Sequence, residues 1–233
     1  MPYSSVLRDF LRRNAPDQTA SLLVRPALGK AKGLCILVHG FAHRARHLRY
    51  FADAFAADGF DVALFDYCTF RSGIRRHAED FLLRFRELAA ERPDARNIRV
   101  LTHSMGGLVF RAAMNAMTEE ERARSGRVVM LGPPNRGSRW GSLACALGLR
   151  RLLPALADMA TFPSAFVHGI PPMPTSRPTG IVRARREGKV HAASVVPRDF
   201  PYVLTELDGG HSDLLKSSRA FDAARRFFDA GAF

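Results

Sequence analysis

Short apolar runs alternate with longer amphipathic segments along most of this chain. The apolar runs lie at 33–38 (GLCILV), 60–65 (FDVALF), 98–101 (IRVL), 128–131 (VVML), 179–184 (TGIVRA) and 202–207 (YVLTEL). Apolar runs of this length are typical of strands that are covered on both faces, as in a parallel sheet. Segments with helical spacing of apolar residues lie at 45–58, 74–92, 106–120 and 217–230. The alternation predicts an α/β fold, in which helices flank a mainly parallel central sheet with an antiparallel edge strand at 21–25.

The length and composition of the chain are typical of a single domain. Its 233 residues, of which 47% are hydrophobic, can fill one sizeable core, so we expect a single domain over 1–233. A segment at about 139–178 interrupts the alternation, because it carries leucines at helical spacing and then a proline-rich run (PPMPTSRP). We expect this insertion to pack against the body of the domain. The alternative is a small lid over a pocket.

The formal charge of +13 raises the question of an anionic partner. The 35 basic residues are spread along the chain and do not form one dense block with interleaved aromatic residues. We therefore expect an arginine-rich solvated surface with at most weak binding to anionic surfaces, and no specific nucleic-acid site. No run approaches the roughly 18 apolar residues that cross a bilayer. Residues 1–16 do not have the pattern of a secretory signal, so we expect a cytoplasmic protein.

The cysteine and histidine patterns do not indicate a metal site. Cys35, Cys68 and Cys145 are widely spaced, which favours free thiols over a disulfide framework or a metal-binding pair. His43 and His47 form an i, i+4 pair, but a zinc site needs a third ligand that the sequence does not identify. We expect this pair at the rim of a site, and no metal or organic cofactor.

The segment LTHSMGG follows the strand predicted at 98–101 and is followed at once by an apolar helix start (LVFRAAM). A strand, a tight turn and a helix are the context of a nucleophile elbow, which exposes a serine hydroxyl on a strained turn. Ser104 is the candidate nucleophile, and the alternative is an ordinary serine in a βα turn. Thr102 departs from the G-x-S-x-G pattern at its first glycine, whereas Gly106 and Gly107 keep the helix side of the turn open.

The strand predicted at 33–38 ends in His39, Gly40 and Phe41. A fold with a nucleophile elbow stabilises a substrate oxyanion with two backbone N–H groups, one just after the nucleophile and one from an early loop. These donors would be Met105 and Phe41. We expect His39 to lie beside the substrate pocket.

The candidate base is His211, in the segment LDGGHSDLL after the last predicted strand. Hydrolases with a nucleophile elbow carry their serine, acid and histidine in that order along the chain, and His211 occupies the expected last position. The alternative is a histidine in a surface loop.

The candidate acid is Glu187, in the loop after the strand predicted at 179–184. Parallel strands end at the same edge of a sheet, so this loop should lie beside the loop that carries His211. The alternatives are a surface glutamate paired with Arg185 or Arg186, and Asp208 as the acid in its place.

Six stretches of the chain resemble small bacterial α/β-hydrolases related to the minimal lipases and esterases. They occur in the same order over nearly the whole chain: LVHGF at 37–41, DGFDVALFDY at 58–67, THSMGGLV at 102–109, VVMLGPPNRGS at 128–138, EGKV at 187–190 and GGHSDLL at 209–215.

The resemblance implies roles for the same residues: Ser104 as nucleophile, His211 as base, Phe41 and Met105 as oxyanion donors, and Glu187 where the family usually has aspartate. It also implies that Pro133, Pro134 and Asn135 line the substrate pocket; the alternative for these three is a rigid turn.

Together the motifs and the resemblance predict a carboxylic-ester hydrolase for short- to medium-chain acyl groups, acting through an acyl-enzyme on Ser104. A thioesterase or an acyltransferase would use the same three side chains. A third possibility is an inactive module of the same fold that binds anionic surfaces.

Overall fold

The computed structural model describes residues 20–175 and 177–233. The segment 1–16, for which we expected no secretory signal, lies outside these residues. Within the described ranges, no helix combines the length and the apolar character that crossing a membrane requires.

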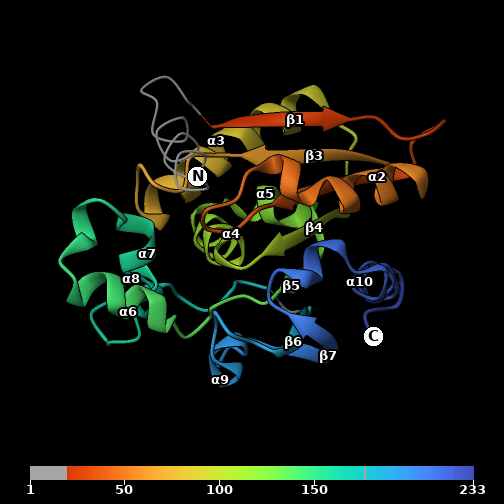
Figure 1. The fold of residues 1–233 in the computed structure, drawn as a ribbon. Helices are drawn as coiled ribbons and strands as arrows, with labels where there is room; N and C mark the ends of the chain where they lie inside the picture. The colour runs from red at the N-terminus through yellow and green to blue at the C-terminus, as the bar shows by residue number, and fades with distance from the viewer. Residues whose placement is uncertain (1–19, 176) are drawn as a thin grey trace, which may run out of the picture.

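A seven-stranded sheet runs through the described part of the chain in the order β1-β3-β2-β4-β5-β6-β7 (Figure 1). β1 pairs with β3 in antiparallel orientation, and every other pair is parallel. The expected edge strand and the six expected central strands therefore all form. Their bounds are β1 (Ser21–Arg25), β2 (Gly33–Val38), β3 (Phe60–Asp66), β4 (Ile98–His103), β5 (Ser125–Leu131), β6 (Thr179–Arg186) and β7 (Tyr202–Gly210).

Helices connect the strands and cover both faces of the sheet. The segment expected as one helix at 106–120 divides in two, because the Thr118 side chain accepts a hydrogen bond from the Glu121 N–H and starts a new helix with a capping box. The helices of the body are η1 (Ala45–Leu48), α2 (Arg49–Ala57), α3 (Ile74–Glu91), α4 (Met105–Ala116), α5 (Glu119–Arg124), α9 (Ala192–Val195), η3 (Asp213–Lys216) and α10 (Ser218–Ala230).

The strand β2 shows how the core is divided. Its residues Ile36 and Val38 join a cluster with α3 and α4, whereas Cys35 and Leu37 join a second cluster with α2 and α10. Successive side chains of a strand point to opposite faces, so a strand that is covered on both faces is apolar throughout. Burial raises the pKa of the Cys35 thiol, in keeping with a residue that fills the core.

The insertion at 139–178 folds into short helices that gather at the left of Figure 1. Met159 and Val167 are buried in the cluster of α3 and α4, and the Asp158 carboxylate accepts a hydrogen bond of 2.7 Å from the Ile74 N–H at the start of α3. The segment thus packs against the body of the domain. Its helices are α6 (Arg139–Ala146), η2 (Leu149–Arg151), α7 (Pro154–Asp158) and α8 (Phe166–Gly169).

Candidate active site

Ser104 lies in a strained turn between β4 and α4. Its backbone has φ 52° and ψ −126°, a left-handed conformation that is costly for a residue with a side chain. The Ser104 N–H donates a hydrogen bond of 2.8 Å to the Leu131 carbonyl, which ties the turn to the end of β5. A Cβ on Gly106 would lie 2.5 Å from the Val38 carbonyl oxygen, so only glycine lets α4 approach β2 this closely. The turn at Ser104 therefore has the strained backbone of a nucleophile elbow, which its sequence context predicts.

Thr102, the residue that departs from the usual motif, is fully buried in β4. Its Oγ1 lies 3.3 Å from the place that a Cβ on Gly107 would occupy. The β-branched side chain fits because the helix presents glycine opposite it.

The turn after β2 lies against the elbow and is held by a carboxylate. Asp66, at the end of β3, accepts hydrogen bonds from the Arg44 Nε at 2.9 Å and from the Ala45 N–H at 2.8 Å. The Ala42 N–H donates to Thr69 at 3.0 Å. Within the described residues, no protein atom accepts a hydrogen bond from the N–H of Phe41 in this turn. That amide is free to donate to a bound oxygen.

Met105 is the first residue of α4 and is fully buried. The N–H groups of the first helical turn have no partner within the helix, and they carry the positive end of its dipole. The N–H of Met105 is one of these groups, and the role of Met105 and Phe41 as oxyanion donors stays a prediction.

His211 and Glu187 meet as expected from the parallel order of β6 and β7. The His211 Nδ1 lies 3.0 Å from both carboxylate oxygens of Glu187, and the two side chains are only 3% and 2% exposed. A Cβ on Gly132 would lie 2.8 Å from that Nδ1, so glycine is needed there. Asp208 instead points to solvent and pairs with Arg185 at 3.2 Å.

Ser104 and His211 line one pocket of about 200 Å³ at the carboxyl ends of the parallel strands. Across the described part of the chain, no hydrogen bond joins their side chains, and such contacts often shorten only when substrate binds. The lining residues come from the elbow, the insertion and the segments after β2, β5, β6 and β7: Phe41, His43, Ser104, Pro134, Ser138, Trp140, Leu156, Met159, Lys189, Val190 and His211.

The residues expected to line this pocket do not all reach it. Pro134 lines it, whereas Pro133 lies beside Gly107 of α4. The Asn135 side chain lines a different cavity, because its amide donates a hydrogen bond of 2.8 Å to the Val195 carbonyl. His39 is buried behind the turn and stacks on Tyr67, with 4.2 Å between the ring centroids.

Neutral histidines surround the base. The ring of His103 lies 4.8 Å from that of His211 and 5.3 Å from that of His43. Burial, reinforced by the neighbouring His47, lowers the pKa of His43 to about 3. Burial and the nearby His211 and His43 hold the pKa of His103 well below its usual range. Both rings are therefore uncharged near neutral pH.

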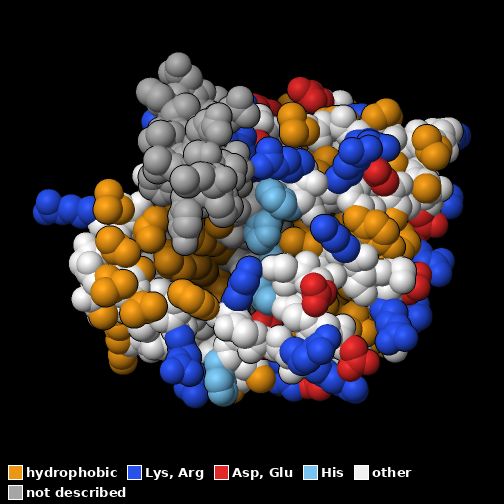
Figure 2. Space-filling model, in the orientation of Figure 1, with side chains coloured by type: hydrophobic (Ala, Val, Ile, Leu, Met, Phe, Trp, Pro, Cys, Tyr) orange, Lys and Arg blue, Asp and Glu red, His pale blue; other side chains and the backbone are white. Residues whose placement is uncertain are grey.

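Figure 2 shows histidine side chains in the middle of one face, beside a hydrophobic area over the helices of the insertion. His43 lines the pocket, and the ring of His47 packs against it with 4.7 Å between the centroids, which is the rim position that we expected for the pair. In 20–175 and 177–233, no group of three or more His, Cys, Asp or Glu residues is arranged to hold a metal ion.

Sequence reasoning missed the contribution of the insertion and of Lys189. Trp140, Leu156 and Met159 reach the pocket from α6 and from the end of α7, and the Lys189 Nζ lies 3.0 Å from the Ser212 hydroxyl beside His211. Two signals were available. Trp140 is the single tryptophan of the chain, and Lys189 follows the candidate acid by two residues.

One family of known proteins matches most of the chain. The sequence model of a family described as serine aminopeptidase, S33, matches residues 29–184. A comparison with curated protein sequences gives no match.

Solved structures are similar over most of the chain. A Bacillus licheniformis lipase in its mature form has a TM-score of 0.69 at 15% identity, covering 89% of this chain and 98% of its own. An Aspergillus fumigatus lipase B has a TM-score of 0.68 at 16% identity, covering 88% and 56%. A Paleococcus ferrophilus monoacylglycerol lipase has a TM-score of 0.61 at 14% identity, covering 91% and 98%. At these identities the likeness shows the α/β-hydrolase fold.

Gly132→Ala should disable the site, because the added methyl group collides with His211 and the backbone there has φ 54°. We expect labelling of the protein by a fluorophosphonate to slow by about 100-fold, the effect of misplacing a catalytic group by about 1 Å. Gly188→Ala is the matched control, because nothing lies within 4 Å of a Cβ at that position. Unchanged labelling of a folded Gly132→Ala protein would contradict the role of His211.

Proposed function

The chain belongs to the serine aminopeptidase S33 family of α/β-hydrolases, and from that premise we propose that it cleaves carboxylic esters through an acyl-enzyme formed on Ser104. The observation that carries the proposal is the buried contact between His211 and Glu187. A carboxylate on Nδ1 fixes the imidazole tautomer, so that Nε2 is the free acceptor that a nucleophilic serine needs.

The reaction follows from the three side chains. His211 takes the proton of the Ser104 hydroxyl as Oγ attacks the ester carbonyl, and the resulting oxyanion binds the N–H groups of Phe41 and Met105. The carbon–oxygen bond to the alcohol then breaks, and His211 returns the proton to the leaving oxygen. Water, deprotonated by the same histidine, attacks the acyl group and releases the acid.

The lining of the pocket supports an apolar acyl group. Leu156, Met159 and Val190 provide apolar walls, and Lys189 is the only Lys, Arg, Asp or Glu among the lining residues that the structure describes. A cation there repels the α-ammonium group that the substrate of an aminopeptidase carries. Esters therefore suit this pocket better than the free amino terminus of a peptide.

We also propose that the insertion at 139–178 acts as a cover for this pocket within a single domain. Trp140 of α6 lines the pocket although its side chain is 53% exposed, so it lies at the mouth. A cover built from three short α-helices and one 3-10 helix limits the length of the acyl group that fits beneath it.

Glu187→Gln should lower kcat for an activated ester by about 10² to 10⁴, because the amide favours the wrong tautomer of His211. Asp208→Asn is the matched control, since it also replaces one carboxylate by an amide, and it should change kcat little. Thermal unfolding of both variants checks that the fold is intact. A large loss in Asp208→Asn with near wild-type turnover in Glu187→Gln would overturn the assignment of the acid.

Hydrolysis rates across a series of nitrophenyl esters test the proposed substrate class. We expect kcat/KM to peak at short to medium acyl chains, because a pocket of about 200 Å³ lies below the usual range of 300–1,000 Å³ for ligand sites. The same series of acyl thioesters, and an aminoacyl anilide, provide the comparison. Faster cleavage of thioesters or anilides than of the matched esters would contradict the proposed substrate class.

A further inference from the structure

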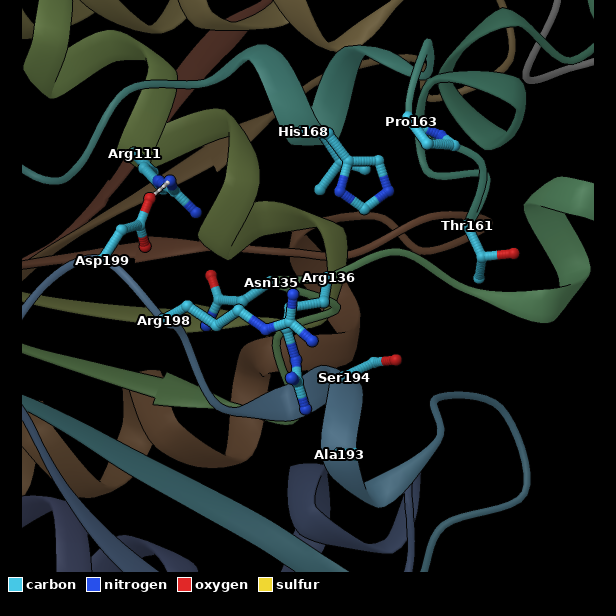
Figure 3. Close-up of a pocket in the computed structure, with 11 residues that line it drawn as sticks. Arg111, Asn135, Arg136, Thr161, Pro163, His168, Ala193, Ser194, Arg198 and Asp199 are labelled. Carbon is cyan, nitrogen blue, oxygen red and sulfur yellow. Dashed lines mark hydrogen bonds and ion pairs between the residues drawn. The ribbon is translucent and has the colours of Figure 1, made fainter.

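A second cavity, of about 590 Å³, opens on the other side of the loop that follows β5. Its walls come from three segments: the loop residues Asn135 and Arg136, the stretch 161–168 of the insertion, and the stretch 193–199 after α9. In Figure 3, Asn135, Arg136 and Arg198 occupy the middle of the view, and the ring of His168 points toward them. Neither Ser104 nor His211 lines this cavity.

One ion pair in the cavity is complete. The buried Arg111 side chain pairs with Asp199 and also donates hydrogen bonds to the carbonyls of Ile170 at 2.7 Å and Pro171 at 3.0 Å. These contacts use the one carboxylate of the lining and tie α4 to the wall of the cavity. The charges of Arg111 and Asp199 therefore offset each other.

Two buried polar atoms of the cavity have no partner. The Nε of Arg136 is buried and donates no hydrogen bond within the described residues. The Oδ1 of Asn135 is also buried and accepts none. Asn135 is only 4% exposed, and the hydrogen bond of its amide nitrogen to the Val195 carbonyl fixes which way its oxygen points. Native structures leave very few such atoms unpaired, so these two need an explanation.

The cavity also carries uncompensated positive charge. Within the parts of the chain that the structure describes, neither Arg136 nor Arg198 forms an ion pair with a carboxylate. Two guanidinium groups that line one cavity without a carboxylate raise its potential, and an oxyanion relieves both the charge and the missing acceptor. The orphan oxygen of Asn135 requires the opposite, a donor.

We propose that this cavity binds a small hydroxylated organic anion, with its carboxylate or phosphate against Arg136 and Arg198 and its hydroxyl donating to Asn135. Arginine suits both kinds of oxyanion because its planar fork can donate two parallel hydrogen bonds. The anion site is separate from the proposed reaction and does not depend on it.

The two sites share a wall. Pro134 and Ser138 line the pocket of Ser104, whereas Asn135 and Arg136, between them in the chain, line the second cavity. A bound anion therefore contacts the opposite side of the loop that borders the proposed substrate pocket.

Calorimetric titration of the full chain tests the site, at fixed ionic strength, with lactate and sn-glycerol 3-phosphate as the two oxyanion probes. Propionate is the matched probe that lacks the hydroxyl of lactate. We expect saturable binding of one equivalent of at least one hydroxylated probe. Arg198→Gln, at an exposed position where folding is not at stake, and Arg136→Gln should each weaken it by at least about tenfold. Ser104→Ala should bind as the wild type does.

Arg225→Gln is the control, because it removes one positive charge from an exposed position on α10. Equal weakening in Arg225→Gln would show binding to net charge alone and overturn the proposal. So would an absence of saturation with both probes up to about 10 mM, a concentration at which even a millimolar site is occupied. Equal affinity for lactate and propionate would contradict the role of Asn135. Loss of binding in Ser104→Ala would place the anion in the substrate pocket.

Discussion

The turn that presents Ser104 depends on close backbone packing that leaves no space for a side chain at Gly106. The left-handed conformation of Ser104 is held on one side by its hydrogen bond to the Leu131 carbonyl and on the other by the contact of Gly106 with the carbonyl of Val38. These contacts bring the ends of β2, β4 and β5 together. A strained backbone of this kind persists only where several surrounding contacts hold it in place, and here three strands and one helix provide those contacts.

The contact between His211 and Glu187 is buried. Glu187 and His211 reach each other because β6 and β7 are parallel and end at the same edge of the sheet, and both side chains are nearly inaccessible. Around them, His43 and His103 are kept neutral by burial, so neither ring adds a positive charge beside His211. Exposed Asp208, closer to His211 in the chain, is directed to arginines at the surface.

Most of the fold could be predicted from the sequence because continuous apolar runs and helical spacing of apolar residues are local patterns. The strained turn at Ser104 was also predictable, because a strand, a small-residue turn and a helix surround it in the sequence. The contact of His211 with Glu187 could be predicted because the loops after neighbouring parallel strands lie at the same edge of the sheet. The direction in which a loop side chain points could not be predicted from the sequence. Asn135 faces away from the pocket because its amide donates a hydrogen bond to the carbonyl of Val195, sixty residues further along the chain.

The proposed function requires a covalent intermediate at Ser104, and rapid-quench mass spectrometry of the chain with nitrophenyl acetate tests this most directly. We expect a burst of one equivalent of nitrophenol, with one acetyl group that peptide mapping locates on Ser104. The adduct should accumulate on the wild type and fail to form when His211 is replaced by alanine. Steady turnover without any adduct, or an acetyl group on another residue, would contradict it.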